Sequence, residues 1–367
     1  MDSLVSLLEN SSTIICVGSG GVGKTTTAAA MGLKAAQLNK KACVVTIDPA
    51  KRLANALGIE NLDNEPKQIM GNWSGELWAL MLDTKTTFDS VVQKYSTSSD
   101  QSESIFNNRF YKNLSQALSG TQEYMAAEKL YELQEDGKFD IVIVDTPPTR
   151  NALDFINAPR QLVRLLDNKV FRVVMLPTKA YLKLISSATQ TFLKSISKVV
   201  GSEVVTDAIT FFQAFEGMEK GFKERAEKVS SLLSDSHTSF ILVTSPRTDS
   251  IDEALFFTSK LSEISINADA LIINRLHSNF FPIQNKSGSV GKDQKKFENI
   301  TPSQAKKILD GFKENLSQLE KVSEKEQQAI KPLLQKIAPA PTVQVPLISQ
   351  DIHDIEGLEF IAKFIFD

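Results

Sequence analysis

A glycine-rich loop that follows a short apolar run constrains this chain more than any other feature. The run Thr13 to Val17 leads directly into Gly18-Ser19-Gly20-Gly21-Val22-Gly23-Lys24-Thr25-Thr26. This segment matches G-x-x-x-x-G-K-[ST] between a strand and a helix, which is the pattern of a phosphate-binding loop. An ordinary glycine-rich turn is the alternative, but it does not require lysine and threonine in this register. The pattern predicts an α/β domain that holds phosphate groups.

The residue types of the loop suit this chemistry. Glycines let the backbone turn its N–H groups toward phosphate oxygens, and a helix that begins near Lys24 directs its positive end at the same oxygens. Lys24 is expected to act on the β- and γ-phosphates, Thr25 to bind Mg²⁺ and Thr26 to lie near the α-phosphate. The residues predicted to bind the nucleotide here are Gly20, Gly21, Val22, Gly23, Lys24, Thr25 and Thr26.

Two aspartates follow other apolar runs. Asp48 comes after Ala42 to Ile47, where a carboxylate beside the phosphate loop can orient an attacking water. Asp145 comes after Ile141 to Val144, and four apolar residues followed by Asp is the pattern of the acid that holds Mg²⁺ in such ATPases. Either residue could instead be a turn or a helix cap. Because the ends of parallel strands meet at one edge of a sheet, the loop and both acids are predicted to converge on one crevice.

Apolar, β-branched runs alternate with helical patterns along the chain. Such runs suit strands that are covered on both faces, so a mostly parallel, doubly wound α/β sheet is predicted. The predicted strands are Thr13 to Val17, Ala42 to Ile47, Ile141 to Val144, Val173 to Leu176, Phe240 to Val243, Ala270 to Ile273 and Val343 to Leu347.

Two long intervals do not fit simple crossovers between strands. Residues 88–135 and 180–235 are predicted to form one helical, client-binding subdomain, while 1–87, 136–179, 236–281 and 339–367 form the ATPase core. Residues 282–338 are predicted as a mobile loop, Pro282 to Asn299, followed by two amphipathic helices over Ser303 to Ile337. Ser96 to Ser104 is predicted to be a flexible loop.

Phenylalanine and methionine gather in the second of these helical intervals, at Phe211, Phe212, Phe215 and Met218. Such side chains can line an adaptable apolar groove. They can equally be the core of a helical bundle.

Composition removes several classes of function. The net charge of -3 gives no electrostatic footprint for nucleic acid. The two cysteines, Cys16 and Cys43, are too few for a disulfide framework and lie in apolar runs, away from metal-ligand spacing. No apolar run is long enough to cross a bilayer, and the N-terminal residues lack the charge pattern of a signal peptide. A cytoplasmic location is therefore expected.

The motifs together resemble the arsenical pump-driving (ArsA-type) and tail-anchored-protein-targeting ATPases, a family of deviant-Walker-A P-loop ATPases. The resemblance rests on three segments: Gly20 to Thr26, Asp48-Pro49-Ala50 and Asp145-Thr146-Pro147-Pro148-Thr149. Suggestive agreement is found at Thr244-Ser245-Pro246, Ile273-Asn274-Arg275 and Val345-Pro346-Leu347.

The resemblance implies hydrolysis of ATP with Mg²⁺ by a dimer that closes face to face around nucleotide. It implies that Asp48 lies in switch I and positions water, and that Asp145 lies in switch II, which links the γ-phosphate to the helical subdomain. It further implies that Asn274 recognises adenine and that Pro346 and Leu347 flank the base. An amide can both donate to and accept from the adenine edge, although Asn274 could as well be a turn residue at a strand end.

The sequence also departs from the family pattern. The family's second lysine, near the start of the loop, is replaced by Ser19. Lys51, Arg52 and Arg150 follow switch motifs and are candidates to supply the missing charge, or are ordinary surface residues. Neither a cysteine cluster for arsenite nor a Cys-x-x-Cys zinc clasp is present, and the sequence contains one phosphate loop instead of two.

These observations predict an ATPase whose homodimer opens and closes to bind and release a client, such as a membrane-protein segment, at the helical subdomain. One alternative is a slow nucleotide-dependent switch on a protein or membrane surface, of the partitioning-ATPase type. Another is the ATPase subunit of an arsenite pump. A small-molecule kinase would need a lid rich in arginines, and the helical intervals contain no such cluster.

Overall fold

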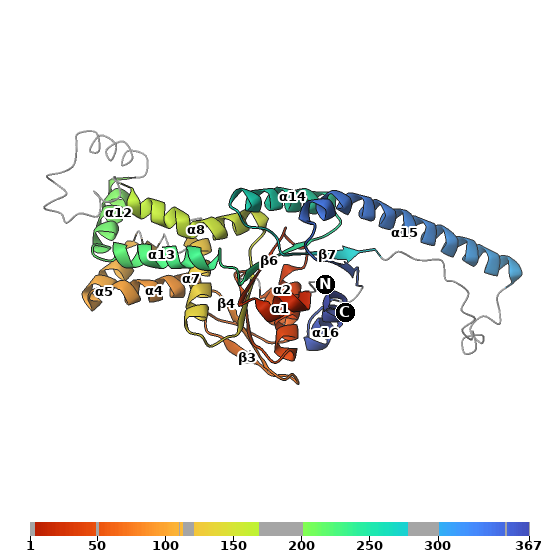
Figure 1. The fold of residues 1–367 in the computed structure, drawn as a ribbon, viewed down its shortest axis with the longest axis horizontal. Helices are drawn as coiled ribbons and strands as arrows, with labels where there is room; N and C mark the ends of the chain where they lie inside the picture. The colour runs from red at the N-terminus through yellow and green to blue at the C-terminus, as the bar shows by residue number, and fades with distance from the viewer. Residues whose placement is uncertain are drawn as a thin grey trace.

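An eight-stranded sheet forms the centre of the computed structural model, which describes residues 4–48, 51–109, 111–112, 121–168, 201–277, 301–348 and 351–366 (Figure 1). Its strands are β1 (Thr13–Val17), β2 (Lys41–Thr46), β3 (Lys67–Ile69), β4 (Glu76–Met81), β5 (Ile141–Asp145), β6 (Thr238–Thr244), β7 (Ala270–Leu276) and β8 (Thr342–Pro346). They lie in the order β3-β4-β2-β5-β1-β6-β7-β8, and every pair is parallel except β3 with β4. The predicted doubly wound, mostly parallel sheet is confirmed.

The register of the central strands brings the predicted motifs to one edge. Cys16, near the end of β1, is the Cα partner of Asp145 in β5, and Thr46 in β2 is the partner of Asp145 on its other side. The phosphate loop leaves β1 at this edge, since α2 (Lys24–Gln37) starts directly after it. The strand order thus places the loop beside both acidic strand ends.

The strands β3 and β4 were not expected from the sequence. β4 has an apolar run, Leu77 to Leu82, but it lacks the β-branched residues of the other strands, and β3 is a three-residue antiparallel edge strand. The predicted strand Val173 to Leu176 lies outside the described residues.

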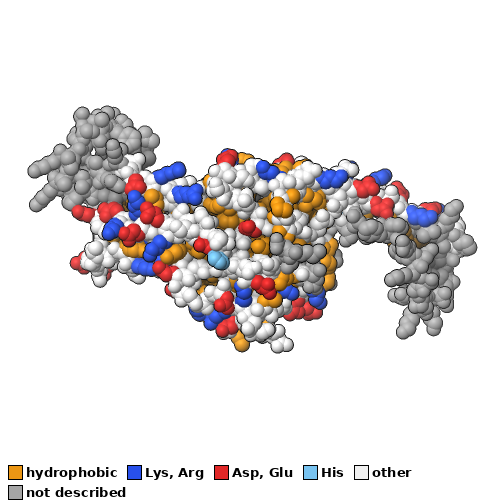
Figure 2. Space-filling model, viewed as in Figure 1, with side chains coloured by type: hydrophobic (Ala, Val, Ile, Leu, Met, Phe, Trp, Pro, Cys, Tyr) orange, Lys and Arg blue, Asp and Glu red, His pale blue; other side chains and the backbone are white. Residues whose placement is uncertain are grey.

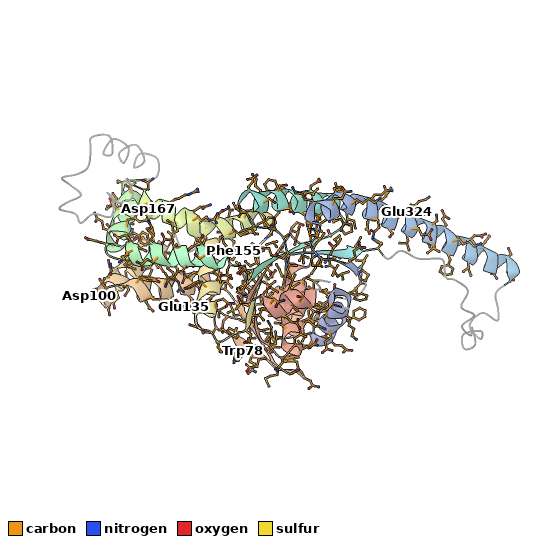
Figure 3. All side chains as sticks on the ribbon, in the orientation of Figure 1. Trp78, Asp100, Glu135, Phe155, Asp167 and Glu324 are labelled. Carbon is orange, nitrogen blue, oxygen red and sulfur yellow. The ribbon has the colours of Figure 1, made fainter. Side chains whose placement is uncertain are left out.

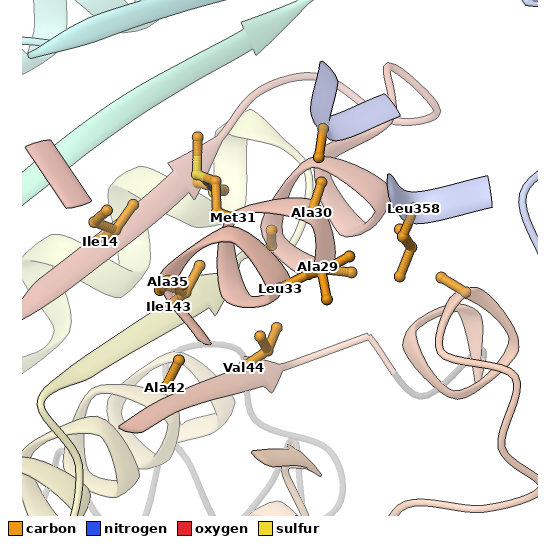
Figure 4. Packing of buried hydrophobic residues seen from close by; sticks show 14 of the residues in the cluster. Ile14, Ala29, Ala30, Met31, Leu33, Ala35, Ala42, Val44, Ile143 and Leu358 are labelled. Atoms are coloured by element: carbon orange, nitrogen blue, oxygen red, sulfur yellow. Dashed lines mark hydrogen bonds between the residues drawn. The ribbon is translucent and has the colours of Figure 1, made fainter. Parts of the chain in front are cut away.

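Two layers of helices cover the sheet, because side chains along each strand alternate between its faces. Ile14 and Cys16 point to a core shared with α2, α1 (Leu4–Asn10) and α16 (Ile355–Phe366). Figure 4 shows this packing, in which α2 contributes alanines and Met31, and α16 contributes Leu358. Ile15 and Val17 point to the other core, which also contains residues of the helices α7 (Thr121–Glu135), α8 (Thr149–Asp167), α14 (Thr248–Glu263) and α15 (Pro302–Ile337).

A cluster of helices stands beside the sheet and has a core of its own (Figure 1). It consists of α4 (Thr84–Tyr95), α5 (Ser99–Asn107), α12 (Ser202–Ala214) and α13 (Glu219–Leu232), with parts of α7 and α8. The prediction of a flexible loop over Ser96 to Ser104 is wrong from Ser99 onward, where α5 begins. Ser98 caps α5 there by accepting a hydrogen bond from the backbone N–H of Gln101 at 3.2 Å.

The phenylalanine-rich stretch lies inside this helical cluster. Phe211, Phe215 and Met218 are buried, and Phe212 packs against them partly buried. The ring of Phe211 contacts those of Phe212 and Phe215 at centroid distances of 5.1 and 4.9 Å. Of the two interpretations open from the sequence, core packing describes these residues, and they do not line an exposed groove.

A single long helix replaces the two helices predicted before β8. α15 spans 36 residues, and a capping box between Thr301 and Gln304 starts it. Pro332 lies inside it without ending it. The predicted loop Pro282 to Asn299 is outside the described residues. The N-terminal part of α15 extends away from the sheet (Figure 1).

Within the described ranges, no helix combines the length and the apolar character that are required to cross a bilayer.

Candidate active site

A cavity of about 760 Å³ opens at the edge of the sheet where β1, β2 and β5 end. It brings together the loop, both predicted acids and the chain that follows Asp145. Its lining residues are Gly20, Gly21, Gly23, Lys24, Thr25, Thr26, Ile47, Asp48, Arg52, Asn55, Ala56, Gln122, Asp145, Thr146, Pro147, Pro148, Arg275, Ile352 and His353.

The backbone of the loop has the conformation that its glycines allow. Gly21 and Gly23 have φ angles of 77° and 100°, in the left-handed region that favours glycine. A Cβ atom on Gly23 would lie 2.3 Å from Nδ2 of Asn274, so no larger residue fits there without displacing that side chain. Since α2 begins at Lys24, the N–H groups of its first turn have no acceptor within the helix and face the cavity edge.

Lys24 is buried at the bottom of the loop, with 8% of its surface exposed. Its Nζ donates to the backbone oxygen of Ser19 at 2.9 Å. Burial lowers the pKa of Lys24, and the charge of Asp145 works in the opposite direction. A buried ammonium of this kind is a strong anchor for an anion, because phosphate oxygens would replace the water that it has lost.

Asp145 is the centre of a small group of oxygen atoms. Its Oδ2 accepts hydrogen bonds from the hydroxyls of Thr25 at 2.7 Å and Thr46 at 2.9 Å. Its Oδ1 is buried and has no hydrogen-bond partner among the described residues. Burial raises the pKa of Asp145, although both hydroxyls and Lys24 favour the ionised form. A carboxylate with one unpaired buried oxygen is suited to a ligand that carries positive charge.

The same atoms fit a magnesium ion that is bound together with phosphate. Mg²⁺ prefers oxygen ligands and commonly takes one or two from the protein while phosphate and water supply the others. Thr25 and Asp145 offer two such oxygens at the cavity edge. Within the described ranges, no three His, Cys, Asp or Glu residues gather to form an all-protein metal site. The donor set therefore fits a nucleotide-bound cation better than a separate structural one.

Asp48 lines the same cavity and is held at the end of β2. Its backbone N–H donates to the hydroxyl of Thr46 at 3.2 Å. The side-chain Oδ2 is 3.4 Å from Nη1 of Arg52 in α3 (Arg52–Ala56), and 28% of the side chain is exposed. Asp48 is thus linked through Thr46 to Asp145. Pro49 and Ala50 lie outside the described residues.

None of the three residues predicted to surround the base, Asn274, Pro346 and Leu347, lines the cavity. Asn274 donates from Nδ2 to the backbone oxygen of Val22 at 2.9 Å, and its Oδ1 accepts from the N–H of Arg275 at 2.9 Å. It therefore ties the phosphate loop to the end of β7. Pro346 and Leu347 are not lining residues, and Leu347 is half exposed. Adenine recognition by these three residues remains a prediction.

The cations that could replace the missing lysine are placed differently from one another. Arg52 lines the cavity. Lys51 is turned to Asn61, whose side-chain oxygen it bonds at 2.6 Å. The side chain of Arg150 is outside the described part of the chain.

Several lining residues had no role predicted from the sequence: Asn55, Ala56, Gln122, Arg275, Ile352 and His353. Arg275 has a φ of 63°, an uncommon conformation for a residue other than glycine and one that is found more often at functional sites. Its position after Asn274 in a family-like segment was the available signal. Ile352 and His353 lie between the segment Val345-Pro346-Leu347 and α16, outside any motif, and the fold brings them to the cavity.

Comparison with known proteins identifies the family of the chain that forms this cavity. The sequence model of the anion-transporting ATPase (ArsA) family matches residues 11–312 of the chain. The chain belongs to this family. Its match covers the loop, both acids and the strands around the cavity, so this ArsA-family protein is an ATPase that binds ATP.

Individual relatives of this family member are all named as ATPases. A protein of Aquifex aeolicus named "Putative arsenical pump-driving ATPase 1" is 24% identical over 365 residues, covering 96% of this chain and 78% of that protein. ATPase get3 of Schizosaccharomyces japonicus is 25% identical over 276 residues, covering 75% and 78%. An ATPase ASNA1 homolog of Cryptosporidium parvum is 25% identical over 302 residues, covering 80% and 74%.

Neither cysteine of this family member, Cys16 or Cys43, is placed to react or to bind a metal at the cavity. Cys16 in β1 and Cys43 in β2 are fully buried. Burial raises the pKa of both thiols, that of Cys43 to about 12. Neither thiol is therefore a thiolate at neutral pH, which is the form that binds metals.

Proposed function

We propose that this cavity hydrolyses ATP to ADP and phosphate, and that the oxygens of Thr25 and Asp145 would hold Mg²⁺ for this reaction. The contact of 2.7 Å between these two side chains carries the proposal, because it places a hydroxyl and a partly unpaired carboxylate beside the phosphate loop. When bound, Mg²⁺ would neutralise charge on the β- and γ-phosphates.

The protein's own groups divide the remaining work. Lys24 and the amides from Gly20 to Thr26 hold the phosphates, which keeps the γ-phosphate in a fixed position. Asp48 orients the attacking water, since it lines the cavity, its backbone N–H is held by the hydroxyl of Thr46, and its carboxylate is paired with Arg52. Water adds to the γ-phosphorus as the bond to the β-phosphate oxygen breaks, and ADP leaves with that oxygen.

Replacing Asp145 with Asn tests this assignment. The amide oxygen can still accept from Thr25 or Thr46, so the fold is kept while the negative charge is lost. Phosphate release is expected to fall at least about 100-fold at saturating ATP and Mg²⁺. Glu227→Gln, on the exposed surface of α13, is a control that removes an equal charge away from the cavity. An Asp145→Asn variant that turns over at the wild-type rate would contradict the proposal.

Arg52 and Arg275 are proposed to balance the negative charge of the triphosphate. They would replace the family's second lysine, whose position is occupied by the uncharged Ser19. Both line the cavity, and both are largely exposed on its open side. Each Arg→Ala variant should slow ATP turnover and leave ATP binding nearly intact, because the charge matters most as phosphate departs. Wild-type turnover in both variants would exclude this role.

Two helices are proposed to transmit the state of the nucleotide. The chain from Asp145 passes Thr146 to Pro148 at the cavity and enters α8, while Gln122 places the start of α7 at the same cavity. Both helices continue into the core of the helical cluster (Figure 1). Loss of the γ-phosphate would thereby move that cluster relative to the sheet.

The helical cluster is proposed as a client-binding subdomain. The sequence predicts three parts of the chain, namely the ATPase core, this helical subdomain and residues 282–338, and we keep that division as a proposal. A cytoplasmic homodimer that closes on nucleotide would use this movement to bind and release a protein client, such as a membrane-protein segment. Because Phe211, Phe215 and Met218 are buried, a client surface must lie elsewhere on the cluster or form when it moves. Sedimentation with and without an ATP analogue tests the dimer, and an unchanged molecular mass would contradict it.

A further inference from the structure

The N-terminal part of α15 carries an apolar stripe that the rest of the described chain does not cover. We call residues 302–322 the arm, which is about 30 Å long at 1.5 Å per helical residue. Large apolar side chains recur on one face of it, with exposed fractions between 38% and 67%. They are Ile308, Phe312, Leu316, Leu319 and Val322, and we call them the apolar stripe.

Three members of the stripe, Phe312, Leu316 and Leu319, begin a longer seven-residue pattern. From Phe312 the spacing alternates between four and three residues through Leu316, Leu319, Ser323, Glu326, Ile330, Leu333 and Ile337. Such a heptad spacing is the pattern by which one helix packs along another. In the C-terminal half the pattern is satisfied, since Ile330, Leu333 and Ile337 are buried in the core beside α14.

The helix is anchored where the buried half of the pattern meets the exposed half. Ser323 donates to the backbone oxygen of His277 at 3.0 Å. Glu326 accepts from the N–H of His277 at 2.8 Å and lies 2.8 Å from its Nδ1. Beyond this anchor the arm extends away from the rest of the protein (Figure 1). The label of Glu324 in Figure 3 marks the part of α15 next to the anchor. The apolar face therefore continues past the point where the body supports it.

The charges on the arm indicate what kind of partner would cover the stripe. The arm has four lysines, Lys306, Lys307, Lys313 and Lys321, and three acids, Asp310, Glu314 and Glu320, so charges of both signs are nearly balanced along it. Side chains of both signs are visible along α15 (Figure 2). A helix that binds an anionic lipid surface typically has a basic polar face, which this arm lacks. Interspersed charges of both signs are typical of helices that pair with helices.

The stripe is also nearly symmetric along the helix, which favours a second copy of the same arm. Ile308 and Val322 lie seven residues on either side of Asn315, and Phe312 and Leu319 lie three and four residues from it. Two arms that run antiparallel and cross at Asn315 would set Ile308 of each against Val322 of the other. Each body would then lie at the opposite end of the pair.

We propose that the arm is a self-association surface: the arms of two copies of this chain pair antiparallel through their apolar stripes, centred on Asn315. This contact does not involve the nucleotide cavity and is separate from the nucleotide-dependent dimer proposed above. An interface of five apolar side chains per copy is small, so association in the micromolar range is expected.

The first test measures self-association of the nucleotide-free full-length chain by sedimentation. Phe312, at 67% exposed, is the most exposed member of the stripe, and Phe312→Asp should weaken the association constant at least about tenfold. Ser317→Asp adds the same charge on the opposite face of the helix and should leave association unchanged. Circular dichroism of both variants checks that the arm is still helical.

Disulfide cross-linking tests the antiparallel arrangement, and it is feasible because Cys16 and Cys43 are buried. Asn315→Cys, at the crossing point, should form covalent dimers on mild oxidation. Ile308→Cys, seven residues away, and Ser317→Cys, on the outer face, should not.

Three results would overturn the proposal. They are a wild-type protein that stays monomeric at about 100 μM, well above a micromolar dissociation constant, equal association of wild type and Phe312→Asp, or cross-linking at Ile308→Cys as efficient as at Asn315→Cys. A monomer that binds neutral or anionic vesicles through the arm would assign the stripe to a lipid surface instead. Since no nucleotide is present, failure here leaves the ATPase proposal untouched.

Discussion

At the scale of single residues, the site keeps two opposite charges in a setting that neither would favour alone. Lys24 and Asp145 are both buried, burial shifts the pKa of each toward its neutral form, and each charge counteracts the shift of the other. Sites of this kind are destabilising in the unliganded protein, and a ligand relieves that destabilisation. Replacing either residue therefore tests the balance between the two charges.

Replacing Lys24 with Met should separate binding from stability. The apolar side chain has a similar length and needs no hydration, which offsets the lost attraction to Asp145, so the stability of the nucleotide-free protein should change by less than about 2 kcal/mol. ATP affinity should fall at least about 100-fold, since a charge-assisted contact to the phosphates is lost. Denaturant titration and calorimetry measure the two effects. A large loss of stability would show that Lys24 has a structural role that the site geometry does not indicate.

Replacing Asp145 with Asn should change how stability depends on pH in the absence of nucleotide. The unfolded carboxyl ionises near its ordinary pKa of 3.8, whereas burial raises the pKa in the folded protein. The folded state therefore holds its proton longer, and wild-type stability is lost as pH rises from about that value through the raised pKa. An amide does not ionise, so the stability of the Asp145→Asn variant relative to wild type should increase over this range and then level off. A difference that is constant or decreases with pH would contradict this prediction.

The residues that carry local chemistry could be predicted from the sequence, and those placed by the fold could not. Lys24, Thr25 and Asp145 belong to motifs whose spacing already implies a strand end beside a helix start, and the structure brings Thr25 and Asp145 within hydrogen-bond reach. His353 reaches the cavity only because β8 and α16 return to it. Asn274 was found as a strand-end residue, but its bond to Val22 depends on the pairing of β7 with the sheet.

At the scale of elements, the helical cluster is fastened by a buried group of charges. Arg225 of α13 donates to Glu128 of α7 at 2.6 Å and to Glu135 at 2.5 Å, and the side chains of Arg225 and Glu128 are only 3% and 2% exposed. The Arg225 guanidinium also lies over the ring of Tyr131 at 4.1 Å. Figure 3 labels Glu135, which lies on α7 near the helical cluster. Because α7 also reaches the cavity through Gln122, this group joins the moving parts of the proposed cycle.

Arg225→Met is expected to destabilise the protein by about 3–5 kcal/mol, because it leaves Glu128 buried without its partner. The double variant Arg225→Met/Glu128→Leu should recover much of this loss. Lys223→Met is a control on the same helix, since its pair with Asp167 is exposed and should be worth less than about 1 kcal/mol. Equal effects of Arg225→Met and Lys223→Met in denaturant unfolding would show that burial of the pair has no importance.

Elements with a β-branched apolar run were predicted correctly, while those without one were not. β1, β5 and β6 are buried along their whole length and were found within one or two residues. β4 was missed although Leu77 to Leu82 are all apolar, because none of these residues is β-branched, and α5 was taken for a loop because it is polar. α15 was predicted as two helices, but it continues through Gly311 and Pro332, and a Cβ at Gly311 would meet nothing within 4 Å.

At the scale of the whole molecule, the sheet, the helical cluster and the arm are three parts with different tasks. The sheet edge holds the site, the cluster is connected to it through α7 and α8, and the arm extends on the opposite side (Figure 1). The parallel sheet and the helical insertions could be predicted from alternating patterns. The direction of the arm could not, since it depends on the anchor between His277 and Glu326 and on packing beside α14.

The most direct test of the central claim is a calorimetric titration of a non-hydrolysable ATP analogue into the wild-type protein, with and without Mg²⁺. We predict one analogue bound per chain in the presence of Mg²⁺, weaker binding after chelation of the metal, and loss of the heat signal in Lys24→Met. No binding by the wild-type protein, or binding that Lys24→Met and chelation both leave unchanged, would contradict the assignment of the cavity to ATP and Mg²⁺.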